Sequence, residues 1–124
     1  MVKADLNALE TDLDPFRTLN WAPMGMTSHI VYEAYDRDRP STMSPTIIED
    51  VIRGNIGFDG LLMSDDLDMN ALSGDVSDRA ANCVAAGCDL ALNCWGRYDE
   101  MVAIADMLPM MPITPANRPS LCIR

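Results

Sequence analysis

The sequence predicts an α/β fold, in which helices cover a parallel sheet. Two observations predict it: the expected elements run helix, strand, helix, strand, helix, strand, helix, and the three strands are largely apolar. A third observation limits the size of that fold. A closed barrel of this class has about eight strands, and an open doubly wound sheet usually has about five or more. We therefore expect either an unusually small domain or a portion of a larger one.

The first half of the chain is expected to begin with a helix and a strand. Residues 4–20 have the helical pattern, and Pro15 is expected to shorten or kink the helix. Its apolar residues recur at helical spacing: Leu6, Leu9, Leu13 and Phe16. The run 24–32 is short, apolar and rich in β-branched residues, which favours a strand. A polar loop containing a proline follows it over residues 33–43.

A second helix and a second strand occupy the middle of the chain. Ser44 is a good N-cap, Pro45 suits the first helical position, and Gly54 suits the stop. Four residues form one apolar stripe between them: Ile47, Ile48, Val51 and Ile52. Residues 60–66 then predict a buried strand that ends in acids, and a short turn of helix is expected at 69–72.

The last third is expected to hold two more helices around one strand. Ser77 is the expected cap of a helix that stops at Gly87. A strand is expected over 88–94, and a final helix over 98–108. The segment 109–124 carries four prolines and is expected to be an irregular tail.

Composition excludes several classes of function. The net charge is −10, with one lysine and scattered arginines, so nucleic-acid binding is not expected. No apolar run approaches the roughly 20 residues that span a membrane. The four cysteines form no C-x-x-C pair and His29 is the single histidine, so we expect reduced thiols in a cytoplasmic protein and no metal site.

The sharpest feature is the acidic end of the second strand, in the run GFDGLLMSDDLDMNALSGD. In parallel α/β folds, chemistry takes place at the carboxyl ends of strands. Asp65 stands where this strand ends. Asp66 faces elsewhere because successive side chains alternate, and Asp68 lies where the chain is turning. These residues are the candidates for chemistry.

Spacing alone leaves more than one interpretation of these acids. An EF-hand loop starting at Asp66 fails, because Ala71 and Ser77 stand where glycine and glutamate are needed. A phosphatase-type aspartate nucleophile usually requires Mg²⁺ and a nearby lysine, and Lys3 is the single lysine. The acids could also do no more than cap the following turn. Spacing does not decide between these interpretations.

Several blocks of the sequence resemble glycoside hydrolase family 3. The first is the pattern G-F-x-G-x-x-x-S-D-x-L-x-M, seen here at residues 57–69. The other blocks, in chain order, lie at residues 9–17, 26–32, 38–48 and 86–89. More narrowly, the blocks are similar to those of bacterial β-N-acetylhexosaminidases that act in cell-wall recycling. The resemblance spans about residues 5–107.

This resemblance implies a (β/α)₈ barrel, of which residues 1–108 would be about the last three units. It implies that Asp65 is the catalytic nucleophile of a glycosidase. Asp65 would form a covalent glycosyl-enzyme and release terminal β-linked N-acetylglucosamine from peptidoglycan fragments with retained configuration. No cofactor or metal is implied. The substrate would be an amino sugar or a peptidoglycan-derived fragment.

The resemblance also indicates what the chain lacks. A glycosidase needs a general acid. In the resembled family, a histidine paired with an aspartate on an earlier loop supplies it, and His29 does not match that pattern. We therefore expect a partial reading frame and an inactive fragment. The alternatives are a non-catalytic remnant or assembling piece and, less favoured, the phosphatase-type nucleophile. Such a piece would self-associate through its open sheet edges.

Three further residues are candidates for contacts with the sugar. His29 lies near the end of a strand, where it either lines the sugar pocket or is a hydrogen-bonded core residue. Met69 either packs against the sugar or fills the core. Trp95 follows the third strand and is the better candidate for stacking on a sugar ring, because Trp21 precedes a strand at the opposite end of the expected barrel.

Overall fold

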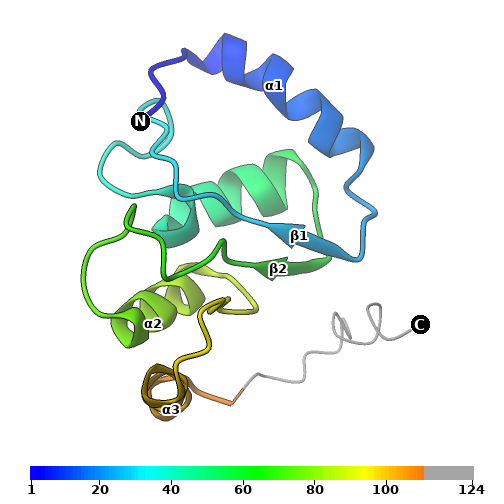
Figure 1. Ribbon diagram of the computed structural model, residues 1–124. Coiled ribbons are helices and arrows are strands. Elements are labelled where there is room, and N and C mark those ends of the chain that lie inside the picture. The colour runs from blue at the N-terminus through cyan, green and yellow to red at the C-terminus, as the bar shows by residue number, and fades with distance from the viewer. Residues whose placement is uncertain (111–124) are drawn as a thin grey trace.

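The computed structural model describes residues 1–110 of the chain. Two parallel strands lie side by side at the centre, α1 forms one edge of the molecule, and α3 lies at the opposite end (Figure 1). In chain order the elements are α1 (Leu6–Thr18), β1 (Met24–Met26), the 3₁₀ turn η1 (Ser41–Met43), the π-helix η2 (Ile47–Asn55), β2 (Leu61–Met63), α2 (Val76–Ala86) and α3 (Tyr98–Met107). The expected α/β class is confirmed. Of the expected tail, residues 111–124 lie outside the described residues.

The sheet is parallel but shorter than expected. Strands β1 and β2 pair from Met24 opposite Leu61 to Met26 opposite Met63. The third expected strand, 88–94, is reduced to one parallel bridge between Met63 and Leu90. Its extended backbone nevertheless follows β2, because the Ser64 N–H donates to the Leu90 carbonyl at 2.9 Å. Three parallel segments therefore lie side by side in the order of the chain.

The first expected strand, 24–32, ends six residues early. The Thr27 N–H still donates to the Met63 carbonyl, at 2.9 Å, and beyond that point a loop replaces the neighbouring strand as partner. The backbone N–H of Thr42 donates to the Ser28 carbonyl at 3.2 Å, and the Thr42 hydroxyl oxygen lies 3.0 Å from the same carbonyl oxygen. Side-chain and loop hydrogen bonds thus take over from the sheet ladder, which apolar pattern alone does not reveal.

Helix η2 begins as expected and ends later than expected. The Ile47 N–H donates to Ser44 Oγ at 3.2 Å, which confirms the cap. Gly54 was the expected stop, but it lies inside the helix. The chain instead leaves the helix at Gly57, whose φ of 73° suits glycine and closes the last turn.

A phenylalanine packed over two glycines connects η2 to the sheet. A Cβ on Gly25 would lie 3.0 Å from the Phe58 ring, and one on Gly60 would lie 2.6 Å from it. Arg53 covers the ring, with its guanidinium carbon 5.4 Å from the ring centroid. Arg53 also donates to the carbonyls of Phe58 and Gly60 and forms an ion pair with Asp89 at 2.8 Å. This contact fixes the start of β2 relative to the helix.

The remaining helices differ from expectation mainly at their ends. Pro15 lies inside α1, which is shorter than the expected helix. Helix α2 begins after Asp75, two residues before the expected cap Ser77. It stops at Gly87, as predicted, with φ at 117°. The expected helical turn at 69–72 is a pair of hydrogen-bonded turns, and α3 lies where it was predicted.

The core lies between η2, β2 and α2. Its members are Ile48, Phe58, Leu62, Leu67, Leu72, Ala80, Cys83, Ala86 and Cys88. The thiols of Cys83 and Cys88 are buried and free, and Cys94 is free and exposed. A hydrogen bond that the Cys88 thiol donates to Cys83, together with burial, raises the pKa of Cys88, so it behaves as a small apolar residue. The described helices include none that is long and apolar enough to cross a membrane.

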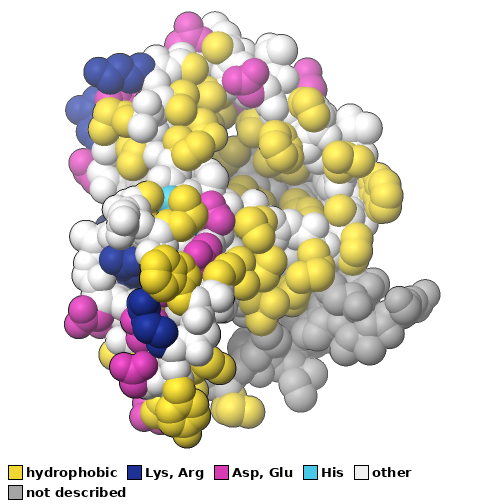
Figure 2. Space-filling model, viewed as in Figure 1, with side chains coloured by type: hydrophobic (Ala, Val, Ile, Leu, Met, Phe, Trp, Pro, Cys, Tyr) yellow, Lys and Arg dark blue, Asp and Glu magenta, His cyan; other side chains and the backbone are white. Residues whose placement is uncertain are grey.

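An apolar hollow of about 530 Å³ lies between α1 and the body of the molecule. Figure 2 shows hydrophobic side chains gathered around it. Its walls include Leu13 and Phe16 of α1, Ile52 of η2, and Met26 of β1. Arg17 and Glu10 of α1 form hydrogen bonds with Asn55 of η2, and these contacts hold α1 beside the hollow. The apolar stripe of α1 is therefore incompletely covered, and Phe16 is exposed.

Candidate functional site

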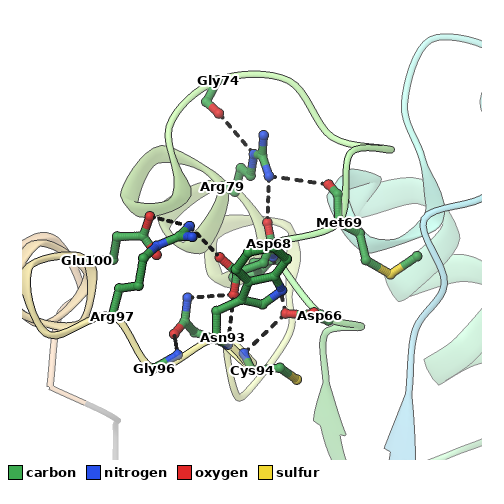
Figure 3. Close-up of polar contacts among 12 residues, drawn as sticks. Asp66, Asp68, Met69, Gly74, Arg79, Asn93, Cys94, Gly96, Arg97 and Glu100 are labelled. Carbon is green, nitrogen blue, oxygen red and sulfur yellow. Dashed lines mark hydrogen bonds and ion pairs between the residues drawn. The ribbon is translucent and has the colours of Figure 1, made fainter.

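The site lies at the carboxyl edge of the sheet, where three loops meet. They follow β1, β2 and the extended segment around Leu90. Figure 3 shows the contacts between the second and third of these loops, centred on Asp66 and Asp68. Because parallel strands end at the same edge, residues far apart in the sequence come together here. The acids that the sequence analysis singled out all belong to the second loop.

Asp65 follows β2 and is partly buried. Its Oδ1 accepts the N–H of Asp66 at 2.8 Å, the one hydrogen bond to this carboxylate among residues 1–110. The hydroxyl of Ser64, the residue before Asp65, accepts the N–H of Leu92 at 2.9 Å. The Asp65 carboxylate therefore keeps most of its hydrogen-bonding capacity for a ligand.

Asp66 is used for structure. Its Oδ1 accepts the backbone N–H groups of Asp68 and Cys94, each at 3.2 Å. Burial alone would raise the pKa of the Asp66 carboxyl, but these hydrogen bonds outweigh burial and hold the pKa below its ordinary value. An ionised Asp66 thus ties the second loop to the third.

Asp68 is the most deeply engaged of the three acids. Its side chain is 2% exposed and accepts from Asn93 Nδ2 at 2.9 Å and from the Trp95 N–H at 3.2 Å (Figure 3). Arg97 approaches it at 3.4 Å and also binds Glu100 at 2.6 Å. The hydrogen bond to Glu100 leads the contacts that raise the pKa of Arg97. Asp68 therefore organises the loop that carries Trp95.

Arg79 of α2 holds the other side of the second loop. Its guanidinium donates to the carbonyls of Leu67 at 2.7 Å, Gly74 at 3.0 Å and Met69 at 3.3 Å. Figure 3 shows this side chain reaching from the helix to the loop backbone. Three carbonyls that a helix or sheet would otherwise satisfy are thereby paired, so the loop keeps one conformation.

His29 joins the first loop to the second. Its Nδ1 lies 2.9 Å from Thr42 Oγ1, and its Nε2 lies 2.8 Å from the Asp66 carbonyl oxygen. Both ring nitrogens thus have protein partners. The ring is partly buried, so both interpretations of His29, core residue and pocket wall, stay compatible with its position.

Met69 and Trp95 lie at the rim of this edge. Met69 is exposed, and its side chain points away from the Asp68 carboxylate (Figure 3). Trp95 is 66% exposed, and the Arg97 guanidinium lies 4.9 Å from its ring centroid. Burial and the acids around it raise the pKa of the neighbouring Cys94 thiol, so this exposed thiol is not an activated nucleophile.

Sequence reasoning missed the residues that support the acids. Thr42, Asn93, Arg97 and Arg79 all position the site, yet none lies beside Asp65 in the sequence. Thr42 belongs to one of the family-like blocks, so the resemblance pointed to its segment. Nothing in the local pattern pointed to Asn93 or Arg97. Within residues 1–110, no group of three or more His, Cys, Asp or Glu side chains could hold a metal ion.

Comparison with known proteins places this edge in a family. Residues 2–117 match the model of the glycosyl hydrolase family 3 N-terminal domain. A β-hexosaminidase of Tolumonas auensis is 40% identical over 114 residues, which is 86% of this chain and 33% of that protein. This chain thus spans about a third of the length of the curated relatives that it matches.

Solved structures agree with the sequence match. A family 3 β-N-acetylglucosaminidase from Paenibacillus sp. str. FPU-7 has a TM-score of 0.79 at 32% identity, over 94% of this chain and 23% of that one. NagZ from Neisseria gonorrhoeae, in complex with N-trifluoroacetyl-D-glucosamine, has a TM-score of 0.76 at 30% identity. That match covers 98% of this chain and 36% of the other.

Proposed function

We propose that this chain, which belongs to glycosyl hydrolase family 3, carries the nucleophile of a retaining β-N-acetylhexosaminidase, and that the nucleophile is Asp65. Its carboxylate would attack the anomeric carbon of a terminal N-acetylglucosamine and expel the leaving group. Water would then cleave the glycosyl ester, so that the configuration is retained.

One observation supports Asp65 over its neighbours. The carboxylates of Asp66 and Asp68 bind backbone and side-chain donors of the third loop, whereas the carboxylate of Asp65 accepts one N–H and is otherwise available. A nucleophile must be ionised, held in place and open to the substrate. The Asp66 N–H holds the Asp65 carboxylate, and the end of a strand provides a rigid support.

The proposed substrate class is a peptidoglycan-derived fragment with a terminal amino sugar. The relatives named β-hexosaminidase and the complex of NagZ with an N-acylated glucosamine support it. In this proposal His29, Met69 and Trp95 line the sugar site. Both nitrogens of His29 are engaged, so the carbon atoms of its imidazole ring would contact the sugar, and the ring would form no hydrogen bond with it. The same resemblance motivates a cytoplasmic location.

The proposed architecture is about the last three units of a (β/α)₈ barrel. The side chains of β1 support it. Gly25 faces the Phe58 ring, so Met24 and Met26 face the opposite side of the sheet, where they are 43% and 53% exposed. In a barrel this face would pack against the interior layers.

A chimera tests the proposal directly. Residues 1–107 would replace the matching segment of the Tolumonas auensis β-hexosaminidase, and hydrolysis of 4-nitrophenyl N-acetyl-β-D-glucosaminide would be measured. We expect activity that Asp65→Asn lowers by about four orders of magnitude or more. Asp106→Asn, on the exposed side of α3, serves as the matched control. Mass spectrometry of the quenched reaction should detect a glycosylated chain only when Asp65 is present. An active Asp65→Asn chimera would refute the assignment.

The alternative is that the 124 residues form a non-catalytic remnant or an assembling piece. The single histidine of the sequence favours it, because both ring nitrogens of that histidine are engaged. The purified chain alone distinguishes the two. Robust turnover of the nitrophenyl substrate that Asp65→Asn abolishes would exclude the alternative, and no turnover beside an active chimera would support it.

A further inference from the structure

Asp66, which donates to Asp65, forms hydrogen bonds through its N–H, its carboxylate and its carbonyl. The N–H of Asp66 donates to Asp65 Oδ1, and the Asp66 side chain accepts from the third loop. The carbonyl of Asp66 accepts from His29 Nε2 at 2.8 Å and from the Met69 N–H at 3.2 Å. The backbone of Asp66 therefore carries the N–H that binds the Asp65 carboxylate and, in the next peptide unit, the carbonyl that the His29 side chain reaches from another loop.

We propose that His29 is a positioning residue that sets the orientation of the Asp65 carboxylate through the backbone of Asp66, as a neutral imidazole with its proton on Nε2. This inference rests on the proposed role of Asp65. The assignment of donors and acceptors around the ring supports it. A carbonyl oxygen can only accept, so Nε2 must carry the proton. In a neutral ring Nδ1 then accepts the single hydroxyl proton of the buried Thr42, and the Ser28 carbonyl, 3.0 Å from that hydroxyl, keeps the Thr42 N–H as its donor.

The buried hydroxyls extend this chain in one direction. Thr27 Oγ1 lies 2.8 Å from Thr42 Oγ1, and Thr42 has a single hydroxyl proton. When Thr42 donates to His29, the Thr27 hydroxyl donates to Thr42. The donors then run from Thr27 through Thr42 and His29 to the Asp66 carbonyl. Such a chain fixes the ring plane and the tautomer together.

The single histidine makes the proposal measurable in the chain as it exists. Long-range ¹H–¹⁵N spectra of the ¹⁵N-labelled chain at about pH 8, above the usual histidine titration range, report the protonation of each ring nitrogen. We expect one imidazole with protonated Nε2 and unprotonated Nδ1. A ring protonated on both nitrogens, as it would be if the Thr42 hydroxyl donated to Ser28, would overturn the proposal. So would a ring that averages between tautomers, through local mobility or because the chain does not fold.

Two matched variants separate positioning from general stability. In His29→Gln the amide nitrogen can occupy the place of Nε2 and donate to Asp66, whereas His29→Asn is too short and reaches only towards Thr42. Amide exchange at Met69, whose N–H shares the Asp66 carbonyl, should rise about tenfold in the Asn variant, as expected for loss of one supporting hydrogen bond. It should stay close to wild type in the Gln variant.

Equal effects of the two variants, or faster exchange throughout the core, would contradict a positioning role. Thr42→Val provides a further measurement, since loss of the donor to Nδ1 should release the fixed tautomer. These measurements use no substrate. An inactive chimera with a fixed Nε2 tautomer would therefore reject the glycosidase proposal alone, and an active chimera with an averaging ring would reject the role of His29 alone.

Discussion

The Asp68 carboxylate should be the main support of the loop that carries Trp95, and its removal should be more costly than removal of its charged partner. Asp68→Ala takes away the acceptor for Asn93 and for the Trp95 N–H. It also removes the ion pair with Arg97. The variant therefore tests whether hydrogen bonds or charge hold the third loop.

The expected magnitude follows from exposure. Two hydrogen bonds to a buried carboxylate contribute about 1–1.5 kcal/mol each. Arg97 is 48% exposed and can still bind Glu100, so its ion pair with Asp68 adds at most about 0.5–1 kcal/mol after solvent screening. Asp68→Ala should thus lower the free energy of unfolding by about 2–4 kcal/mol. Asp68→Asn keeps one acceptor oxygen and should cost less.

Urea denaturation followed by circular dichroism measures these differences, and Arg97→Ala is the control. Arg97→Ala should cost about 1 kcal/mol or less, including its contact with the Trp95 ring. Equal costs for Asp68→Ala and Arg97→Ala would show that charge pairing holds the loop. A cost below about 0.5 kcal/mol for Asp68→Ala would show that the loop does not depend on this carboxylate.

Three further outcomes are expected. Gly60→Ala places a Cβ 2.4 Å from the Ala22 carbonyl and should cost about 1–3 kcal/mol. Gly54→Ala, in an exposed helical position, places its Cβ 3.3 Å from the Glu49 carbonyl, which offsets the gain in helix propensity, and should change stability by less than about 1 kcal/mol; thermal melting compares the two variants. The pKa of Asp66 is lower in the folded chain than in the unfolded chain, so its ionised form stabilises the fold above the unfolded value of about 3.9, and this contribution is lost as the pH falls through the folded pKa. Stability measured against pH should therefore fall less steeply on the acid side in Asp66→Asn than in Asp106→Asn. Size-exclusion chromatography should find the isolated chain self-associated or marginally folded, and a compact monomer with a sharp melting transition would contradict the proposed partial barrel.

Helix positions could be predicted because apolar spacing determines which face is buried. Their ends were less predictable, because single backbone conformations decide them. Gly87 was correctly identified as a stop, but Gly54 was not, since Gly57 three residues later adopts the left-handed conformation. Likewise Asp75, rather than Ser77, precedes α2. Several residues at each boundary satisfied the same rule, and packing selected among them.

Strand lengths could not be predicted, because pairing depends on the neighbour and not only on the strand itself. The apolar run 24–32 is long enough for a full strand, yet the loop around Thr42 takes over the hydrogen bonds of Ser28. The run 88–94 pairs through Leu90 and otherwise follows β2 through loop hydrogen bonds. Both runs lie beside β2 and run parallel to it, as a parallel sheet requires, and both were assigned too many residues.

The roles of the three acids could not be separated from their spacing. Asp66 and Asp68 find their partners in Asn93, Cys94 and Trp95, which lie 25 to 28 residues further along the chain. No local pattern contains that information. The interpretation that the acids serve only the following turn describes Asp66 in part, since its carboxylate accepts the Asp68 N–H. The Asp65 carboxylate accepts only the N–H of Asp66 among the described residues.

The blocks that resemble the family gain a physical meaning from these contacts. Gly57 ends a helix, Gly60 makes room for Phe58, and Asp89 binds Arg53 and the N–H that starts β2. Each of these residues completes a contact within the chain, so its presence is explained by the fold. Asp65 differs, because nothing among the described residues except its neighbour's N–H uses its carboxylate. An ionisable group that the fold supports but does not use is the group through which a family 3 chain would act on a substrate.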